Sequence, residues 1–139
     1  MVFEERLREL GAQACEAREQ AGDPWPDFVL HDACGLHRRQ GRGAAVHAVV
    51  AAVTGQAPRS FGPSADRSAC CGAGDFHDLR RPEEAAQVAK ASVPDDLPRG
   101  AWIITGDTTC RGALAGAATR HRVFDLVGFL AEWLKPVLA

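Results

Sequence analysis

Apolar residues recur along this chain with two spacings, one helical and one typical of short buried strands. Phe3, Leu7, Leu10 and Ala14 follow one another at helical intervals and predict an amphipathic helix over residues 2–19. Short apolar runs predict four strands, at residues 27–32, 57–61, 101–105 and 122–124. Further helices are expected at residues 44–53, 82–92 and 111–119, and after Asp125, which can cap a last helix.

Glycine and proline mark where several of these elements begin and end. Two prolines and a glycine make residues 21–26 a turn, and Gly55 is placed to end the helix before it. Pro82, followed by two glutamates, is typical of a helix start. Residues 62–75 are rich in small residues and form a long loop, a type of segment that often carries function.

Strands and helices alternate along the chain, and this order predicts an α/β fold. We expect a small, mostly parallel four-stranded sheet with helices on both faces. The 139 residues are enough for one domain and too few for two.

Composition and charge exclude several functional classes. Sixteen basic and 18 acidic residues give a formal net charge of −2, which offers no support for binding nucleic acid or an anionic membrane. No apolar stretch has the length of a membrane span, and the acidic, amphipathic start does not resemble a secretory signal. We therefore expect a cytoplasmic protein.

The five cysteines are the most informative feature of the sequence. An odd number without a secretory signal argues against a disulfide framework. Cys34 follows the first predicted strand, Cys70 and Cys71 lie in the loop after the second, and Cys110 comes just after the third. Because loops after parallel strands gather at the carboxyl edge of a sheet, we expect these four cysteines to converge there.

Four converging thiolates are soft ligands, suited to an iron–sulfur cluster or to zinc. Gly72 and Gly74 would give the backbone around the adjacent cysteines freedom to turn and would leave N–H groups near the sulfurs. The CxxC spacing typical of zinc sites is absent, which favours the cluster. Simple burial is the competing explanation for any single cysteine, and we assign it to Cys15.

The histidines are the other residues that could bind a metal or take part in catalysis, and we interpret most of them as structural. Four histidines are expected in the core or beside surface arginines: His31, His37, His47 and His121. His77 directly follows CCGAGDF and is a weaker candidate for the site. The sequence contains no Walker loop, no GxGxxG and no recognisable Ser/His/Asp arrangement.

The segments HDACGLHR, ACCGAGDF and TGDTTC, with a Pro-Glu helix start between the last two, resemble the cysteine-rich CCG domain. This domain occurs, usually in two copies, in one of the subunits of heterodisulfide reductase and in the iron–sulfur subunits of glycolate oxidase and of the lactate-utilisation complex. The resemblance covers residues 27–134 of a single domain that spans 1–139, with residues 1–26 forming a preceding helix and linker. It implies that four cysteines ligate an iron–sulfur cluster: Cys34, Cys70, Cys71 and Cys110. Ala113 stands where the family has a final cysteine, a pattern closer to the lactate- and glycolate-type members.

Two functions of different classes follow from these observations. The first is a redox subunit of an oxidoreductase complex that holds an iron–sulfur cluster, 4Fe–4S in type, and transfers electrons or acts on thiols and disulfides. The second is a structural or partner-binding subunit that holds zinc or no metal. In either case we expect a homodimer or a complex with other subunits, with the arginines after Cys34 near the interface.

Overall fold

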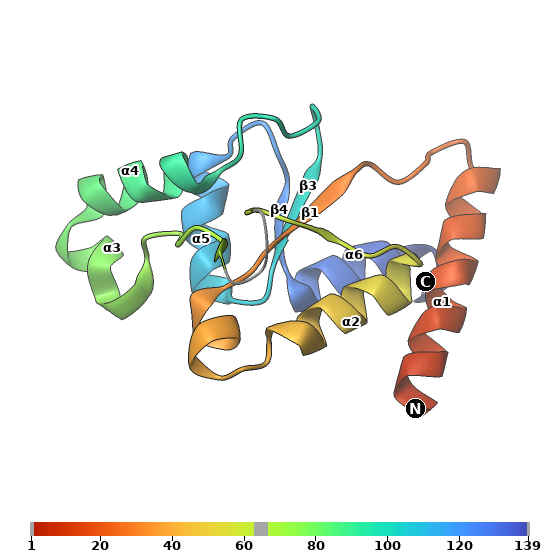
Figure 1. Ribbon diagram of the computed structural model, residues 1–139. Helices are drawn as coiled ribbons and strands as arrows, with labels where there is room; N and C mark the ends of the chain where they lie inside the picture. The colour runs from red at the N-terminus through yellow and green to blue at the C-terminus, as the bar shows by residue number, and fades with distance from the viewer. Residues whose placement is uncertain (1, 63–66, 139) are drawn as a thin grey trace.

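A computed structural model describes residues 2–62 and 67–138, which fold around one parallel sheet. The four strands are β1 (Phe28–His31), β2 (Arg59–Ser60), β3 (Trp102–Thr105) and β4 (Val123–Asp125). They lie in the order β2-β1-β3-β4, and every neighbouring pair is parallel. Figure 1 labels β1, β3 and β4, which cross the middle of the molecule. The predicted α/β class and the parallel four-stranded sheet are confirmed.

Six α-helices and two short helical turns surround the sheet in the described residues. The helices are α1 (Val2–Gln20), α2 (Gly43–Thr54), α3 (His77–Arg80), α4 (Pro82–Ser92), α5 (Thr108–Ala117) and α6 (Leu126–Leu138). The turns are η1 (Gly35–Arg39), which is π-helical, and η3 (Gly74–Phe76), which is of the 3-10 type. None of the helices in the described ranges is both long and apolar enough to cross a membrane.

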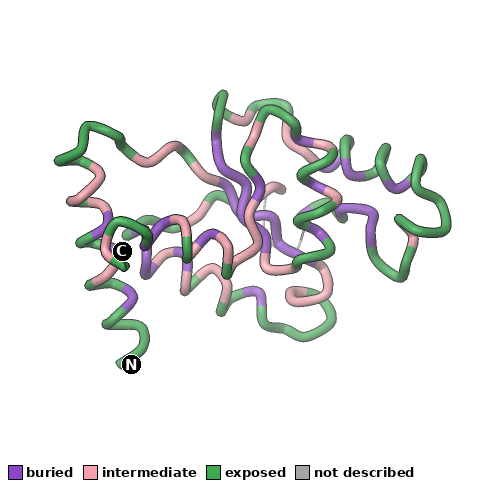
Figure 2. The backbone as a smooth tube through the Cα atoms, turned by 180° about the vertical axis from the view of Figure 1, so that it is seen from behind, coloured by how far each residue is buried: buried purple, intermediate pink, exposed green. Residues whose placement is uncertain are grey.

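Alternate strand residues build two separate apolar layers, as the period of two in a strand requires. Leu30, Trp102 and Ile104 pack with residues of α1, α2 and α6. Val29, Ile103 and Val123 pack on the opposite face with Leu114 of α5 and with two cysteines, Cys71 and Cys110. Helices therefore cover both faces as predicted, and Figure 2 shows buried residues running through the central strands. The end formed by α3 and α4 is largely exposed (Figure 2).

Several local signals in the sequence act as expected. Gly55 takes a left-handed φ of 73° and ends α2, and its N–H donates to the Ala51 carbonyl. Pro82 occupies the first turn of α4. The Asp125 carboxylate accepts a 2.7 Å hydrogen bond from the Gly128 N–H at the start of α6.

Other boundaries differ from the prediction. The helix expected at 111–119 begins at Thr108, because the Asp107 carboxylate accepts hydrogen bonds from the N–H groups of Thr109 and Cys110. The helix expected at 44–53 is present as α2, and it is preceded by η1, which was not predicted, with Gly41 in a left-handed conformation between them. The strand expected at 57–61 is reduced to β2. Of the predicted 62–75 loop, residues 63–66 lie outside the described residues, and its last residues form η3.

The strand order creates a switch point between β1 and β3. The chain leaves β1, passes through α2 to β2 on one side, and then returns through α4 to β3 on the other side of β1 (Figure 1). Loops that leave two adjacent strands in opposite directions open a crevice at the carboxyl edge, where α/β sheets of this kind bind ligands.

Candidate functional site

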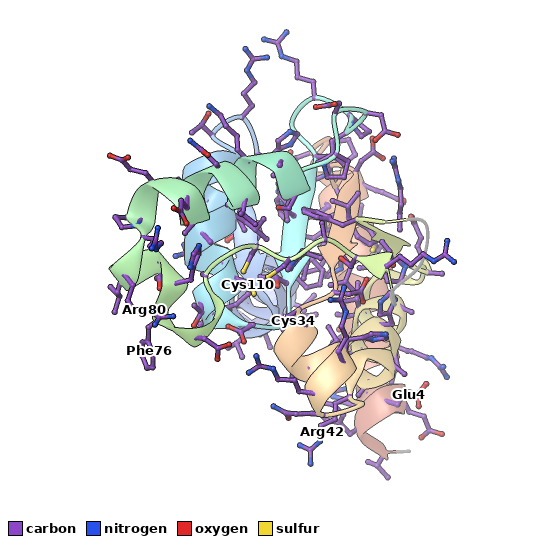
Figure 3. All side chains as sticks on the ribbon, turned by 60° about the vertical axis from the view of Figure 1, so that its left-hand side comes forward. Glu4, Cys34, Arg42, Phe76, Arg80 and Cys110 are labelled. Atoms are coloured by element: carbon purple, nitrogen blue, oxygen red, sulfur yellow. The ribbon has the colours of Figure 1, made fainter. Side chains whose placement is uncertain are left out.

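The four predicted cysteines all follow the carboxyl ends of strands, in three different local structures. Cys34 comes after β1 and begins η1. Cys70 and Cys71 lie in the irregular segment between β2 and η3. Cys110 was expected in a loop and lies instead in the first turn of α5, since Asp107 starts that helix earlier than predicted. Figure 3 labels Cys34 and Cys110, which lie close together near the middle of the molecule.

Cys71 and Cys110 form the closest contact in this group. Their sulfur atoms lie 3.0 Å apart, within hydrogen-bonding distance, although Cys71 precedes β3 in the sequence and Cys110 follows it. Both are buried, and both belong to the apolar layer on the α5 face of the sheet. All five cysteines of the chain are free thiols.

A cavity of about 470 Å³ opens beside this pair. Cys34, Cys71 and Cys110 line it together with Asp107 and Thr109 at the start of α5. The rest of the lining comes from η1, from η3 and the residue before it, and from α3: Gly35, Arg39, Ala73, Gly74, Asp75, Phe76, Asp78 and Leu79. Cys70 is exposed and lies at the outside of the group, where its thiol is near those of Cys34 and Cys71.

The two glycines beside the cysteines have different roles. Gly72 takes a left-handed φ of 83°, and its N–H donates a 3.3 Å hydrogen bond to the Cys70 sulfur. A Cβ at Gly72 would come within 2.8 Å of the Val88 Cβ and 2.9 Å of the Ala85 carbonyl oxygen on α4. Gly74 has no left-handed φ and faces open space, so the predicted freedom resides in Gly72 alone. The residues with unusual φ further along are Asp75 and Phe76.

The thiols do not ionise alike. The Cys110 thiol donates to the Cys71 sulfur and so lowers the pKa of Cys71 to about 6, against the opposing effect of burial. The same hydrogen bond, together with burial, raises the pKa of Cys110. Partial burial raises the pKa of the Cys70 thiol, although the residue as a whole is exposed. The pair therefore carries one thiolate near neutral pH, and the thiolate is the form that binds metals and attacks electrophiles.

Polar contacts tie the cysteine loop to the residues that follow β1. Arg38 donates a 2.6 Å hydrogen bond to the Ser68 carbonyl, and Arg39 pairs with Asp75 at 3.2 Å. His31, at the end of β1, has its Nε2 3.0 Å from the Ala69 carbonyl oxygen. Sequence reasoning assigned His31 and Asp107 no part in the site. The sequence contained a signal for each of them: His31 opens the HDACGLHR segment, and Asp107 lies in the TGDTTC segment two residues after β3 ends.

Two sequence candidates lie elsewhere. Cys15 is half-buried on α1 and packs against the apolar layer on the opposite face of the sheet, in agreement with its assignment as a structural residue. His77 begins α3, where its Nε2 lies 4.0 Å from a Glu84 carboxylate oxygen, and it does not line the cysteine cavity.

The cysteine thiols are suitable metal ligands, but their side chains are not arranged around a single metal ion. Among residues 2–62 and 67–138, no group of three or more His, Cys, Asp or Glu side chains is arranged to hold a metal ion. Two thiolates on one tetrahedral metal at 2.3 Å would lie about 3.8 Å apart, whereas Cys71 and Cys110 lie 3.0 Å apart. Four soft donors, an adjoining cavity and an N–H directed at a sulfur nevertheless fit a thiolate-ligated metal group.

An α/β domain with cysteines gathered at the switch point of its sheet defines a class of cysteine-rich domains. The family model described as "CCG: Cysteine-rich domain" matches residues 28–115, well over half of the chain. The chain therefore belongs to the CCG cysteine-rich domain family. The matched segment contains Cys34, Cys70, Cys71 and Cys110 and leaves out Cys15. Neither the curated proteins nor the solved structures compared with this chain include a match.

Proposed function

We propose that this domain binds an iron–sulfur cluster through Cys34, Cys70, Cys71 and Cys110 and serves as a redox subunit of an oxidoreductase complex. The observation that carries the proposal is the meeting of Cys34, Cys71 and Cys110 around one cavity in a chain of the CCG family. These residues come from separate strand ends, and unrelated buried cysteines have no reason to meet in this way.

The thiols themselves support the proposal. A metal group needs deprotonated cysteine, and Cys71 already favours its thiolate because Cys110 donates to it. The Gly72 N–H directed at Cys70 is the type of contact that tunes the potential of a cluster. When bound, a cluster would supply one-electron redox chemistry. The protein residues would hold it in a partly enclosed cavity at the sheet edge.

Thiol and disulfide chemistry belongs to the same proposal. A thiolate in hydrogen-bond contact with a second thiol is the arrangement that exchanges with a disulfide substrate.

Five free thiols suit a reducing compartment, and we therefore propose a cytoplasmic location. A 4Fe–4S-type cluster is the form that we propose, with Ala113 in place of the family's final cysteine.

The test is metal analysis of the chain purified under strict anaerobiosis. We expect brown protein with iron and sulfide in matched amounts, visible charge-transfer absorption and an EPR signal on reduction. Cys15→Ser is the matched control, since Cys15 lies on the other face of the sheet. A colourless protein that holds about one zinc per chain would refute the redox proposal and leave the structural zinc-binding alternative.

A further inference from the structure

His31 connects three separate segments of the cysteine site. Its ring is almost fully buried, with 1% of the residue exposed. Nε2 lies 3.0 Å from the Ala69 carbonyl oxygen, and Nδ1 lies 3.1 Å from the Thr105 hydroxyl. The ring thus bridges the end of β1, the end of β3 and the residue directly before Cys70.

The hydrogen bonds determine which nitrogen carries the proton. A carbonyl oxygen can only accept, so Nε2 must donate to Ala69. Burial lowers the pKa of His31, which keeps the ring neutral, and the Nδ1 atom then accepts from the Thr105 hydroxyl. Phe61 packs edge-on against the ring with centroids 5.0 Å apart and holds it in this orientation.

The two hydrogen-bond partners of His31, Ala69 and Thr105, lie close in sequence to Cys71 and to Cys110, respectively. Ala69 precedes Cys70 and Cys71, while Thr105 ends β3 just before Asp107 and the first turn of α5, which carries Cys110. A change in the distance between Ala69 and Thr105 would therefore change the separation of the Cys71 and Cys110 sulfurs. Arg38 also contacts this loop, through Ser68, but from a less buried position.

We propose that His31 is a positioning residue that holds the Cys70–Cys71 loop against the end of β3 and so brings the Cys71 sulfur to Cys110. Its bearing on metal binding rests on the proposed function. The placement of the two sulfurs does not, and it can be measured in the metal-free protein.

The test is the rate at which diamide oxidises Cys71 and Cys110 to a disulfide in the reduced, metal-free chain. The two thiols lose two protons and two electrons, an S–S bond forms, and the N=N bond of diamide is reduced to the hydrazine. Peptide mapping of the alkylated protein identifies the pair. Because a misplacement of about 1 Å can slow a proximity-driven reaction by about a hundredfold, we expect His31→Leu to slow this step at least about tenfold.

Three variants separate positioning from general destabilisation. His31→Gln keeps a donor for Ala69 and should restore part of the rate. Thr105→Val removes the hydroxyl at Nδ1 without changing the shape, and should slow the reaction less than His31→Leu. Thr54→Val removes a buried hydroxyl at the end of α2, where it donates to Val50, and should leave the rate unchanged.

The outcomes distinguish this proposal from the proposed function. Unchanged oxidation in His31→Leu, or equal slowing in Thr54→Val, would overturn the role of His31, with circular dichroism confirming that the variants are folded. If His31→Leu does not fold, Thr105→Val decides, and an unchanged rate there counts against the proposal. A wild-type chain that binds no iron refutes the proposed function and leaves the oxidation result valid. If the wild-type chain does bind iron, His31→Leu should also alter the visible charge-transfer absorption of the iron-loaded protein.

Discussion

Replacing Gly72 with alanine should damage this domain far more than the same change at Gly74. Gly72 has a φ of 83°, and its added Cβ would meet the Val88 Cβ at 2.8 Å and a backbone oxygen of α4 at 2.9 Å. Neither atom is the end of a flexible side chain, so α4 or the cysteine loop must move. Gly74 has neither constraint, because no atom would lie within 4 Å of its Cβ.

The magnitude follows from two separate costs. A left-handed backbone costs an L-residue about 1–2 kcal/mol, and overpacking costs about 1–3 kcal/mol. The lower entropy of the unfolded alanine chain offsets about 0.4–1 kcal/mol of this. We therefore expect Gly72→Ala to lower the free energy of unfolding by about 2–4 kcal/mol. For 139 residues the unfolding entropy is about 0.3 kcal/mol/K, so Tm should fall by about 7–14 °C.

Thermal unfolding of the reduced, metal-free protein, followed by circular dichroism, measures this effect. Gly74→Ala is the matched control and should shift Tm by no more than about 2 °C, since surface substitutions stay within about 0.5 kcal/mol. Equal shifts for the two variants would refute the argument that Gly72 is fixed by its φ and by its contact with α4.

Three further predictions concern the thiols and the assembly. Replacing Cys34, Cys70, Cys71 or Cys110 with serine should sharply lower the metal content, most of all at Cys71 and Cys110, whereas Cys15→Ser should leave it unchanged. Metal analysis measures this, and loss of metal in Cys15→Ser would count against the site. The metal-free protein should gain stability as pH rises from about 6 to about 8.5, because in that window folded Cys71, with its pKa lowered to about 6, has lost a proton that the unfolded thiol still holds. Urea unfolding measures the gain, and Cys71→Ser should remove it. Light scattering should show a homodimer or a complex with a second subunit, and a strict monomer with no co-purifying partner would contradict this expectation.

Much of the fold could be predicted from the sequence, because its signals are local. The apolar run that became β3, the proline that begins α4 and the glycine that ends α2 each act within a few residues of their own position. Four cysteines were expected to meet at the carboxyl edge of the parallel sheet; three of them line one cavity, and the exposed Cys70 does not.

The details of the site depend on contacts between distant segments, which the sequence pattern does not contain. His31 resembled an ordinary core histidine until its two partners, Ala69 and Thr105, were known. Gly72 and Gly74 looked equivalent, and the left-handed φ of Gly72 together with its close contact with α4 distinguishes them. Whether Cys110 belongs to a loop or to a helix was decided by the Asp107 cap, a signal that the sequence contained and that could have been recognised.

The return of the chain across β1 has a consequence for the order of events during folding. Cys34 precedes β2 in sequence, yet its neighbour Cys110 is delivered only after the chain has passed through β2 and α4 and inserted β3. Contacts between such distant segments form late, because closing a long loop costs entropy before the contact is made. A nascent or partly folded chain would present single thiols without the complete set. If the domain holds the proposed metal group, loading should therefore follow the pairing of β3 with β1, which brings Cys110 to the other cysteines.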